Sequence, residues 1–343
     1  MYSNKGAILI IYTGGTIGMI KDHKTNTLKP FDFSEIEKKV PEIKGFGYNI
    51  ASVSLYPLVD SSNINIKSWI KIAKIIELNY SKYDGFVVLH GTDTMAYSAS
   101  ALSFMLENLE KPVIFTGSQL PIGTLRTDGK ENLITAIEIA AAKLNGTSIV
   151  PEVCIYFENK LYRGNRTTKQ SSKHFNAFIS DNYPPLALAG INIDYNFSAI
   201  FYPSKKNKLK VNTVFNDNVL IIKLFPGFTE NYFSEILQLP KLKGIILETF
   251  GSGNAPTIKW FIKILKKAID NEIIVLNITQ CDTGGTDMGK YETSRELLNI
   301  GVTNGADMTT EAALTKLMYL IGKKLPYSEL KNELQHSIRG EMS

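Results

Sequence analysis

Hydroxyl, carboxylate and amine side chains follow the apolar runs of this chain in a pattern that suits attack on a carbonyl group. Thr16 comes just after Gly14-Gly15, two glycines that let the backbone turn sharply and leave amide N–H groups available. A threonine hydroxyl is a weak nucleophile, so another group must accept its proton. A lysine in a buried polar setting can act as that base. Thr92, Asp93 and Lys169 would form such a unit.

The elements that must position these residues are short apolar strands alternating with helices. Ile8–Tyr12 and Gly85–Leu89 are continuous apolar runs, typical of parallel strands that are buried on both faces. Such alternation predicts a mostly parallel sheet with helices on both faces. Further strands are predicted at 48–55, 112–115 and 153–157, and helices at 34–40, 65–78, 95–108 and 127–144.

Polar residues occur where successive predicted strands end. Thr16 follows the first strand, Asp60-Ser61-Ser62 the second, Thr92-Asp93 the third and Ser118 the fourth, while Lys169 lies beyond the fifth. The carboxyl ends of parallel strands lie at one edge of a sheet, so these side chains can converge on one pocket.

Plainer interpretations of the same residues remain open at this point. Thr92-Asp93-Thr94 also suits the N-cap of the following helix, and Lys169 could be a surface lysine. A dinucleotide-binding loop is a weaker alternative, because the third glycine, Gly18, comes too late and the next segment is polar and irregular.

The length of 343 residues allows two domains. We predict a larger N-terminal α/β domain over 1–191, an interdomain linker over 192–216, where the alternation is lost, and a smaller parallel α/β domain over 217–343. In the smaller domain, strands are predicted at 219–223, 244–248 and 273–277, and helices at 230–237, 257–270, 292–299 and 310–321.

Composition narrows the function classes. Hydrophobic residues make up 44% and charged residues 21% of the chain, as in a globular protein, and the net charge of +5 is too small and dispersed to predict nucleic-acid binding. Only two cysteines are present, which suits a reducing compartment. No membrane-spanning run or signal peptide is recognised, so a cytoplasmic protein is expected. No residue spacing indicates a metal, and no cofactor is predicted.

Taken together, the motifs resemble the bacterial L-asparaginase family, in its cytoplasmic type I branch. The resemblance spans nearly the whole chain, with the motifs in the order of the family. They are TGGTIGM at 13–19, HGTDTMAYSASALSFMLENL at 90–109, TGSQLPI at 116–122, LYRGNRTTK at 161–169, GNAP at 253–256 and GADMTTEAALTKL at 305–317.

The resemblance implies hydrolysis of asparagine to aspartate and ammonia. Thr16 would attack the side-chain amide carbon and form an acyl-enzyme, which water would then cleave. Thr92, Asp93 and Lys169 would form the second catalytic group, with Asp93 also holding the α-ammonium group of the substrate.

Substrate binding and assembly follow from the same resemblance. Ser61, with Asp60 and Ser62, would bind the α-carboxylate and α-amino ends, and Ser118 would contact the amide through its backbone carbonyl. A homodimer, or a dimer of dimers, is implied, with a neighbouring subunit completing each site through Asn254.

The chain departs from the family pattern at three places. Many members carry a tyrosine in the loop after the nucleophile, whereas here Thr27 or Leu28 occupies that place. Asp287 is the candidate for a carboxylate from the second subunit. Glu248-Thr249 stands where relatives with an allosteric site have an arginine, so allostery is not predicted.

Other functions fit these residues less well. A broader asparaginase/glutaminase is the nearest alternative. The glutaminase half of a transfer-RNA amidotransferase is disfavoured, because the first strand begins by Ala7. A catalytically silent amide sensor would have lost one of Thr16, Thr92, Asp93 or Lys169, and all four are present. A nucleotide-binding dehydrogenase would need the third glycine and the acidic residue of a dinucleotide-binding loop, which are missing here.

Overall fold

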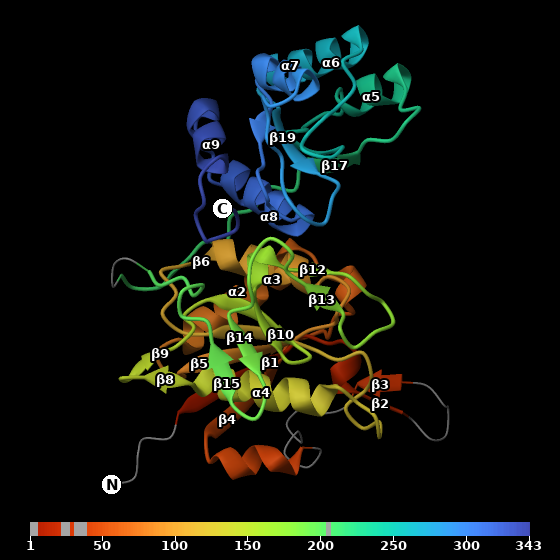
Figure 1. Cartoon of the computed structure of the whole chain (residues 1–343). Coiled ribbons are helices and arrows are strands. Elements are labelled where there is room, and N and C mark those ends of the chain that lie inside the picture. The colour runs from red at the N-terminus through yellow and green to blue at the C-terminus, as the bar shows by residue number, and fades with distance from the viewer. Residues whose placement is uncertain (1–5, 22–27, 31–39, 204–206) are drawn as a thin grey trace. The chain divides into compact units, whose positions relative to one another are not determined.

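The computed structural model describes residues 6–21, 28–30, 40–203 and 207–343, with the backbone alone for 20–21 and 28–30 (Figure 1). The chain divides into two compact units, residues 1–213 and 214–343. Each unit has its own mostly parallel sheet, so the predicted α/β class is confirmed. The helix predicted at 34–40 lies, apart from Val40, outside the described residues.

Strand β1 (Ala7–Tyr12) lies inside the eight-stranded sheet of the first unit, because it carries no charged residue and four of its six residues are β-branched or aromatic. It pairs in parallel with β4 (Asn49–Ser54) on one side and β5 (Gly85–Leu89) on the other. The parallel series continues from β5 to β7 (Val113–Thr116) and from β7 to β10 (Val153–Phe157).

The order of these strands creates a switch point between β1 and β5. The chain passes from β1 to β4 on one side of it and then to β5 on the other, so the winding reverses there. In doubly wound sheets, ligands bind outside the carboxyl ends of the strands at such a point. The residues that follow β1 and β5 therefore flank the expected crevice.

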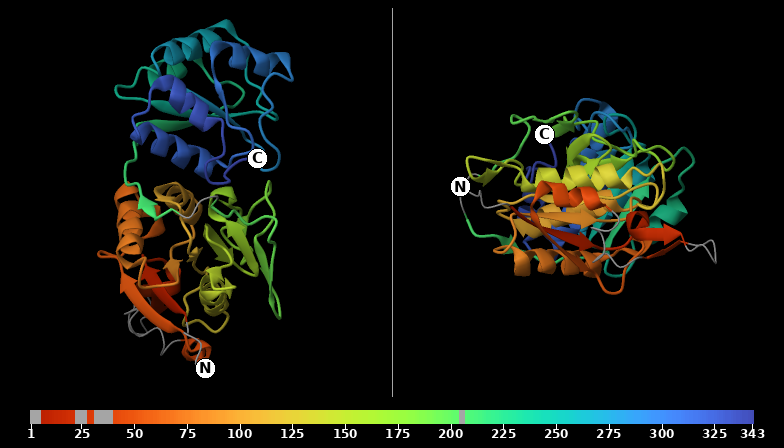
Figure 2. Two further views of the ribbon diagram at one scale, coloured as in Figure 1. Left: turned by 90° about the vertical axis from the view of Figure 1, so that its left-hand side faces the viewer. Right: turned by 90° about the horizontal axis from the view of Figure 1, so that it is seen from below.

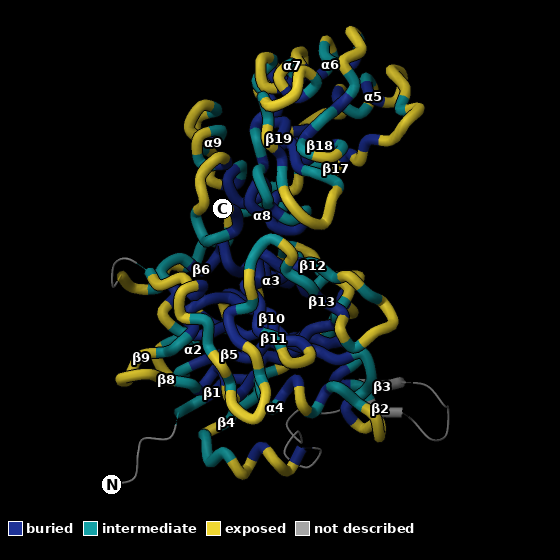
Figure 3. The backbone as a smooth tube through the Cα atoms, viewed as in Figure 1, coloured by how far each residue is buried: buried dark blue, intermediate teal, exposed yellow. Residues whose placement is uncertain are grey.

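Both faces of this sheet are covered. Ile8, Ile10 and Tyr12 pack in one cluster with side chains of α4 (Gly129–Ala141). The alternate residues Leu9 and Ile11 are buried as well. Helices α2 (Ile66–Asn79) and α3 (Met95–Met105) cover the face opposite α4 (Figures 1 and 2), and the central strands are dark blue in the burial view (Figure 3).

Two predicted helices end earlier than their apolar patterns suggested. Helix α3 ends at Met105 because Leu106–Glu107 (β6) pairs with Lys210–Val211 (β16), and α4 ends at Ala141 because Lys143–Leu144 (β8) forms a hairpin with Thr147–Ser148 (β9). The other short elements are β2 (Met19–Lys21), β3 (Leu28–Pro30), β12 (Thr168–Lys169), β13 (Phe178–Ile179) and the 3₁₀ turns Thr16–Gly18, Pro41–Phe46, Ser61–Asn63 and Gly164–Arg166.

Much of the segment 192–216, predicted as a linker, belongs to the first unit. Beyond β10 the sheet continues with three antiparallel strands, β11 (Lys160–Arg163), β14 (Ala187–Ala189) and β15 (Ile193–Tyr195). β15 lies in the predicted linker, as does β16. β15 has three residues and β16 has two, too few for an alternating pattern to be recognised.

The second unit is a smaller parallel α/β domain. Its sheet has the order β17 (Val219–Lys223), β18 (Gly244–Thr249), β19 (Ile274–Thr279), β20 (Thr303–Asn304). Phe233 and Phe261 stack at 5.0 Å between ring centroids and join α5 to α6. The helices are α5 (Glu230–Ile236), α6 (Lys259–Asp270), α7 (Glu292–Ile300), α8 (Thr310–Gly322) and α9 (Tyr327–Leu334), of which α9 was not predicted.

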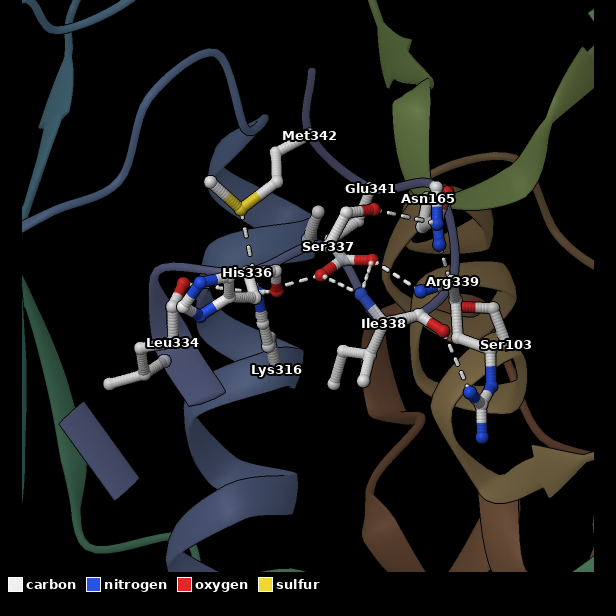
Figure 4. Close-up of polar contacts among 12 residues, drawn as sticks. Ser103, Asn165, Lys316, Leu334, His336, Ser337, Ile338, Arg339, Glu341 and Met342 are labelled. Atoms are coloured by element: carbon white, nitrogen blue, oxygen red, sulfur yellow. Dashed lines mark hydrogen bonds and ion pairs between the residues drawn. The ribbon is translucent and has the colours of Figure 1, made fainter. Parts of the chain in front are cut away.

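A fully buried ion pair holds residues 336–343 against α8 (Figure 4). Lys316 Nζ lies 2.7 Å from Glu341 Oε1, and both side chains are 0% exposed. Lys316 also donates to the carbonyl oxygens of Leu334 and His336, at 3.0 and 2.6 Å. The Glu341 carboxylate accepts the N–H of Ile338 at 3.0 Å, so both charges are compensated.

Replacing Glu341 with glutamine should lower the free energy of unfolding by about 3–5 kcal/mol, because it leaves the Lys316 ammonium buried without its counter-charge. Urea unfolding measures the change. The matched control is Asp270→Asn, which removes the exposed partner of Lys266 and should have little effect. Equal effects of the two substitutions would contradict the importance of the buried pair.

Candidate active site

The turn after β1 touches the turn after β5 through backbone atoms. Gly15 has φ 89°, a left-handed conformation that favours glycine. A Cβ at Gly15 would lie 2.5 Å from the Gly91 nitrogen, and a Cβ at Gly14 would lie 2.3 Å from the Val59 oxygen. Only residues without side chains allow this approach. It brings the half-buried Thr16, which begins the next 3₁₀ turn, beside the Gly91-Thr92-Asp93 segment.

Ser61 is brought to the same place by a second close approach. A Cβ at Gly91 would lie 2.5 Å from Ser61 Oγ, and Thr94 Oγ1 donates to the Ser61 carbonyl at 2.6 Å. Ser61 is buried, whereas its neighbours Asp60 and Ser62 are exposed. Hydrogen bonds from the Ser62 hydroxyl and the Ser62 N–H lower the pKa of the Asp60 carboxyl. They therefore favour the ionised form of the Asp60 side chain.

Thr92, Asp93 and Lys169 form one hydrogen-bonded group. Lys169 Nζ donates to Thr92 Oγ1 at 2.9 Å and to Asp93 Oδ1 at 2.6 Å. The Lys169 side chain is 17% exposed and that of Asp93 is 65% exposed, so the lysine is covered while the carboxylate faces solvent. Because the lysine donates to the Thr92 oxygen, the Thr92 hydroxyl hydrogen is left to donate to another group.

The loop after β7 is held by the start of α4. A Cβ at Gly117 would lie 2.4 Å from the His90 oxygen, so Ser118 follows a residue that touches the end of β5. The Asp128 carboxylate accepts the N–H of Gln119 at 3.0 Å, and Asn132 Nδ2 donates to the Gly117 carbonyl at 3.0 Å. These bonds fix the backbone on both sides of Ser118.

The segment that leads to Lys169 is fixed by a buried ion pair. Arg163 Nε lies 2.6 Å from Glu152 Oε2, and Arg163 Nη2 donates to the Ala199 carbonyl at 2.8 Å. The guanidinium carbon of Arg163 lies 4.4 Å from the centroid of the Tyr183 ring. After the 3₁₀ turn, Lys169 in β12 pairs with Phe178 in β13 (Figure 1).

The remaining predicted residues lie in the second unit or outside the fully described residues. Asn254 belongs to the second unit, where its Oδ1 accepts from Thr293 at 2.7 Å, and Asp287 is exposed in that unit. Thr27 lies outside the described residues, and Leu28 is described by its backbone alone. Among the described residues, no group of three or more His, Cys, Asp or Glu side chains is arranged to hold a metal ion. Within the same ranges, no helix has the length and apolar character needed to cross a membrane.

Sequence reasoning missed the side chains that support the site. Asp128 lies at the start of the helix predicted over 127–144, and its carboxylate binds the preceding loop instead of capping the helix. Glu152 and Arg163 were not singled out. Glu152 directly precedes the apolar run 153–157 and Arg163 lies six residues beyond its end, so no local pattern distinguishes this pair from surface charges.

Family models match both units. The model described as "Asparaginase, N-terminal" matches residues 7–201, and "Glutaminase/Asparaginase C-terminal domain" matches residues 218–334. The doubly wound sheet of the first unit and the smaller parallel sheet of the second are therefore the two domains of an asparaginase-type protein. The chain is a member of the asparaginase family, and the predicted enzyme class, a hydrolase acting on amides, is confirmed.

Individual relatives agree with the family assignment. The chain is 42% identical to L-asparaginase 1 of Escherichia coli K12 over 340 residues, which cover 99% of this chain and 98% of the relative. It is 39% identical to a 60 kDa lysophospholipase of Mus musculus, over 98% of this chain and 62% of that protein. The crystal structure of L-asparaginase I from Vibrio cholerae superposes with a TM-score of 0.88 at 42% identity, covering 99% of each chain.

Gly15→Ala should destabilise the protein far more than Gly146→Ala. Both glycines have positive φ, 89° and 83°, so either alanine has the backbone strain of about 1–2 kcal/mol. Only Gly15 also meets backbone at 2.5 Å, whereas no atom lies within 4 Å of a Cβ at Gly146. Urea unfolding of both variants measures the difference. Equal stabilities would mean that the contact with Gly91 relaxes at no cost.

Proposed function

We propose that this chain hydrolyses L-asparagine to L-aspartate and ammonia, with Thr16 as the nucleophile. The observation that carries the proposal is the group in which Lys169 Nζ donates to Thr92 Oγ1 at 2.9 Å and to Asp93 Oδ1 at 2.6 Å. Thr92 and Asp93 directly follow Gly91, which touches the turn that carries Thr16. Membership of the asparaginase family and the name of the E. coli relative support this substrate.

The reaction takes place in two displacements. Thr16 Oγ attacks the side-chain amide carbon, the C–N bond breaks, and the proton from the hydroxyl leaves with the nitrogen as ammonia. An ester on Thr16 results. Water then adds to the ester carbon and releases aspartate, which restores the Thr16 hydroxyl. Backbone N–H groups at the glycine turn are suited to stabilise the oxyanion in each step.

Thr92, Asp93 and Lys169 act as one group in this scheme. The Thr92 hydroxyl is oriented by Lys169, so its hydrogen can bond to the substrate amide or to the attacking water. The exposed Asp93 carboxylate suits the α-ammonium of the substrate, since only one of its oxygens is bonded to Lys169.

The other predicted contacts complete the substrate site. Ser61, between Asp60 and Ser62, would bind the α-carboxylate and α-amino ends. The fixed loop around Ser118 would present a backbone carbonyl to the amide NH₂. Since both ends of a small zwitterion would be held by polar groups, the site favours an amino acid over a neutral amide.

Assembly and location are part of the proposal. A homodimer, or a dimer of such dimers, would place Asn254 of a neighbouring subunit at each site, as the family resemblance implies. A cytoplasmic location is supported by the two cysteines, Cys154 and Cys281, neither of which forms a disulfide.

Glutamine is the second candidate substrate. The family model that matches residues 218–334 is named after both glutaminase and asparaginase. The two substrates differ by one methylene, and a pocket discriminates one methylene by about 1–3 kcal/mol. Both amides therefore belong in every assay of this protein.

Thr16→Val should abolish ammonia release from asparagine while leaving the fold intact, because it keeps the shape of threonine and removes the nucleophilic oxygen. Thr16→Ser restores a hydroxyl and should recover part of the rate. Steady-state ammonia assays and circular dichroism compare the variants. Near wild-type turnover by Thr16→Val would show that another group attacks the amide.

Lys169→Met should reduce kcat by about 100-fold or more with a smaller change in KM, because it removes the group that orients Thr92 and neutralises Asp93. Lys173→Met, at an exposed lysine of the same segment, is the control and should be neutral. A rise in KM with unchanged kcat would instead assign Lys169 to substrate binding.

A further inference from the structure

A line of buried hydrogen bonds ends at the segment that carries Thr92. His90, the residue after β5, is 1% exposed. Its Nδ1 lies 2.7 Å from the Gly91 carbonyl oxygen, and its Nε2 lies 2.9 Å from Ser98 Oγ on α3. Trp69 Nε1 on α2 donates to the same Ser98 oxygen at 2.9 Å. The end of β5, helix α3 and helix α2 are thus joined through His90, Ser98 and Trp69.

The chemistry of the partners fixes the direction of these bonds. The Gly91 carbonyl can only accept, so Nδ1 must carry a hydrogen. The indole of Trp69 can only donate, so the Ser98 oxygen accepts from it and the Ser98 hydroxyl is free to donate to Nε2. Burial lowers the pKa of His90 to about 4, so the ring is neutral near pH 7 with Nε2 unprotonated.

These hydrogen bonds matter because they end at Gly91, which packs tightly against two other parts of the site. The Gly91 backbone abuts Gly15 on one side and Ser61 Oγ on the other, and each of those approaches is too close for a side chain. A rotation of the Gly91 peptide would therefore displace Thr92 and Asp93 and disturb the Thr16 turn. Both ring nitrogens of His90 are occupied within the protein, so the ring does not act on the substrate itself.

We propose that His90, oriented by Ser98 and Trp69, is a positioning residue that fixes the Gly91 carbonyl and so holds Thr92 and Asp93 opposite Thr16. The role concerns kcat first, because a displacement of about 1 Å in a reacting group can reduce a rate about 100-fold. Movement of Asp93, which the proposed function assigns to the α-ammonium, adds a smaller rise in KM. This proposal rests on the proposed function for its kinetic test and on the imidazole tautomer for an independent one.

The kinetic test compares Ser98→Ala with Ser98→Thr. Alanine removes the hydroxyl that holds Nε2, and kcat for ammonia release from asparagine should fall about 10- to 100-fold, with a smaller change in KM. Threonine keeps the hydroxyl and should restore most of the rate. The matched control is Thr315→Val, which removes a buried helical hydroxyl in the second unit and should leave kcat unchanged.

Substitutions of His90 itself separate the hydrogen bond from the volume of the ring. His90→Asn keeps a donor near the position of Nδ1 and should retain more activity than His90→Leu, which has none. Equal kcat values for these two variants, or a wild-type kcat for Ser98→Ala while Thr16→Val is inactive, would overturn the positioning role and leave the proposed function standing.

The independent test is nitrogen-15 NMR of histidine-labelled protein, with the His90 signals assigned from their loss in His90→Asn. The proposal requires the Nδ1–H tautomer in the wild type near pH 7 and a mixed or altered tautomer in Ser98→Ala. An Nε2–H tautomer would overturn it. If the wild type released no ammonia from asparagine, the proposed function would fail, and this spectrum would still decide the arrangement of His90.

Discussion

The backbone contact between Gly15 and Gly91 is the constraint on which the candidate site depends. It joins the turns that follow β1 and β5, the two strands at the switch point of the first sheet. A Cβ at Gly15 would overlap the Gly91 backbone, and a Cβ at Gly91 would overlap the Ser61 side chain, so both positions require glycine. In the proposed function, Thr16, Ser61 and the Thr92-Asp93-Lys169 group act together, and the contact between these turns is what would allow it.

Buried polar groups keep the surrounding loops in place. Each strand end is tied to a different support, the Gly91 carbonyl to His90, the Ser118 loop to Asp128, and the Lys169 segment to the Arg163–Glu152 pair. Hydrogen bonds of this kind rigidify a site when every partner is satisfied. Loops carry the chemistry in this fold, and the sheet together with these bonds supplies the precision that loops lack.

The sequence was informative where the signal is local. Apolar runs predicted β1, β5 and β10, and the glycine turn marked the place where Thr16 leaves the sheet. The antiparallel strands β11, β14 and β15 escaped prediction because they have no distinctive periodicity. The bond between Lys169 and Thr92 joins residues 77 positions apart, so it follows from tertiary structure. The strand-end positions suggested the grouping, and the family resemblance supported it. The supporting charges, such as Glu152, look like surface residues until their burial is known.

The most direct test of the account is ammonia release by the purified wild-type protein, with asparagine and glutamine assayed in parallel over a wide concentration range. The account predicts rapid hydrolysis of asparagine, a hyperbolic dependence on its concentration and slower release from glutamine. No release from either amide by correctly folded protein would contradict the central claim, that this arrangement of Thr16, Thr92, Asp93 and Lys169 is an amide-hydrolysing site.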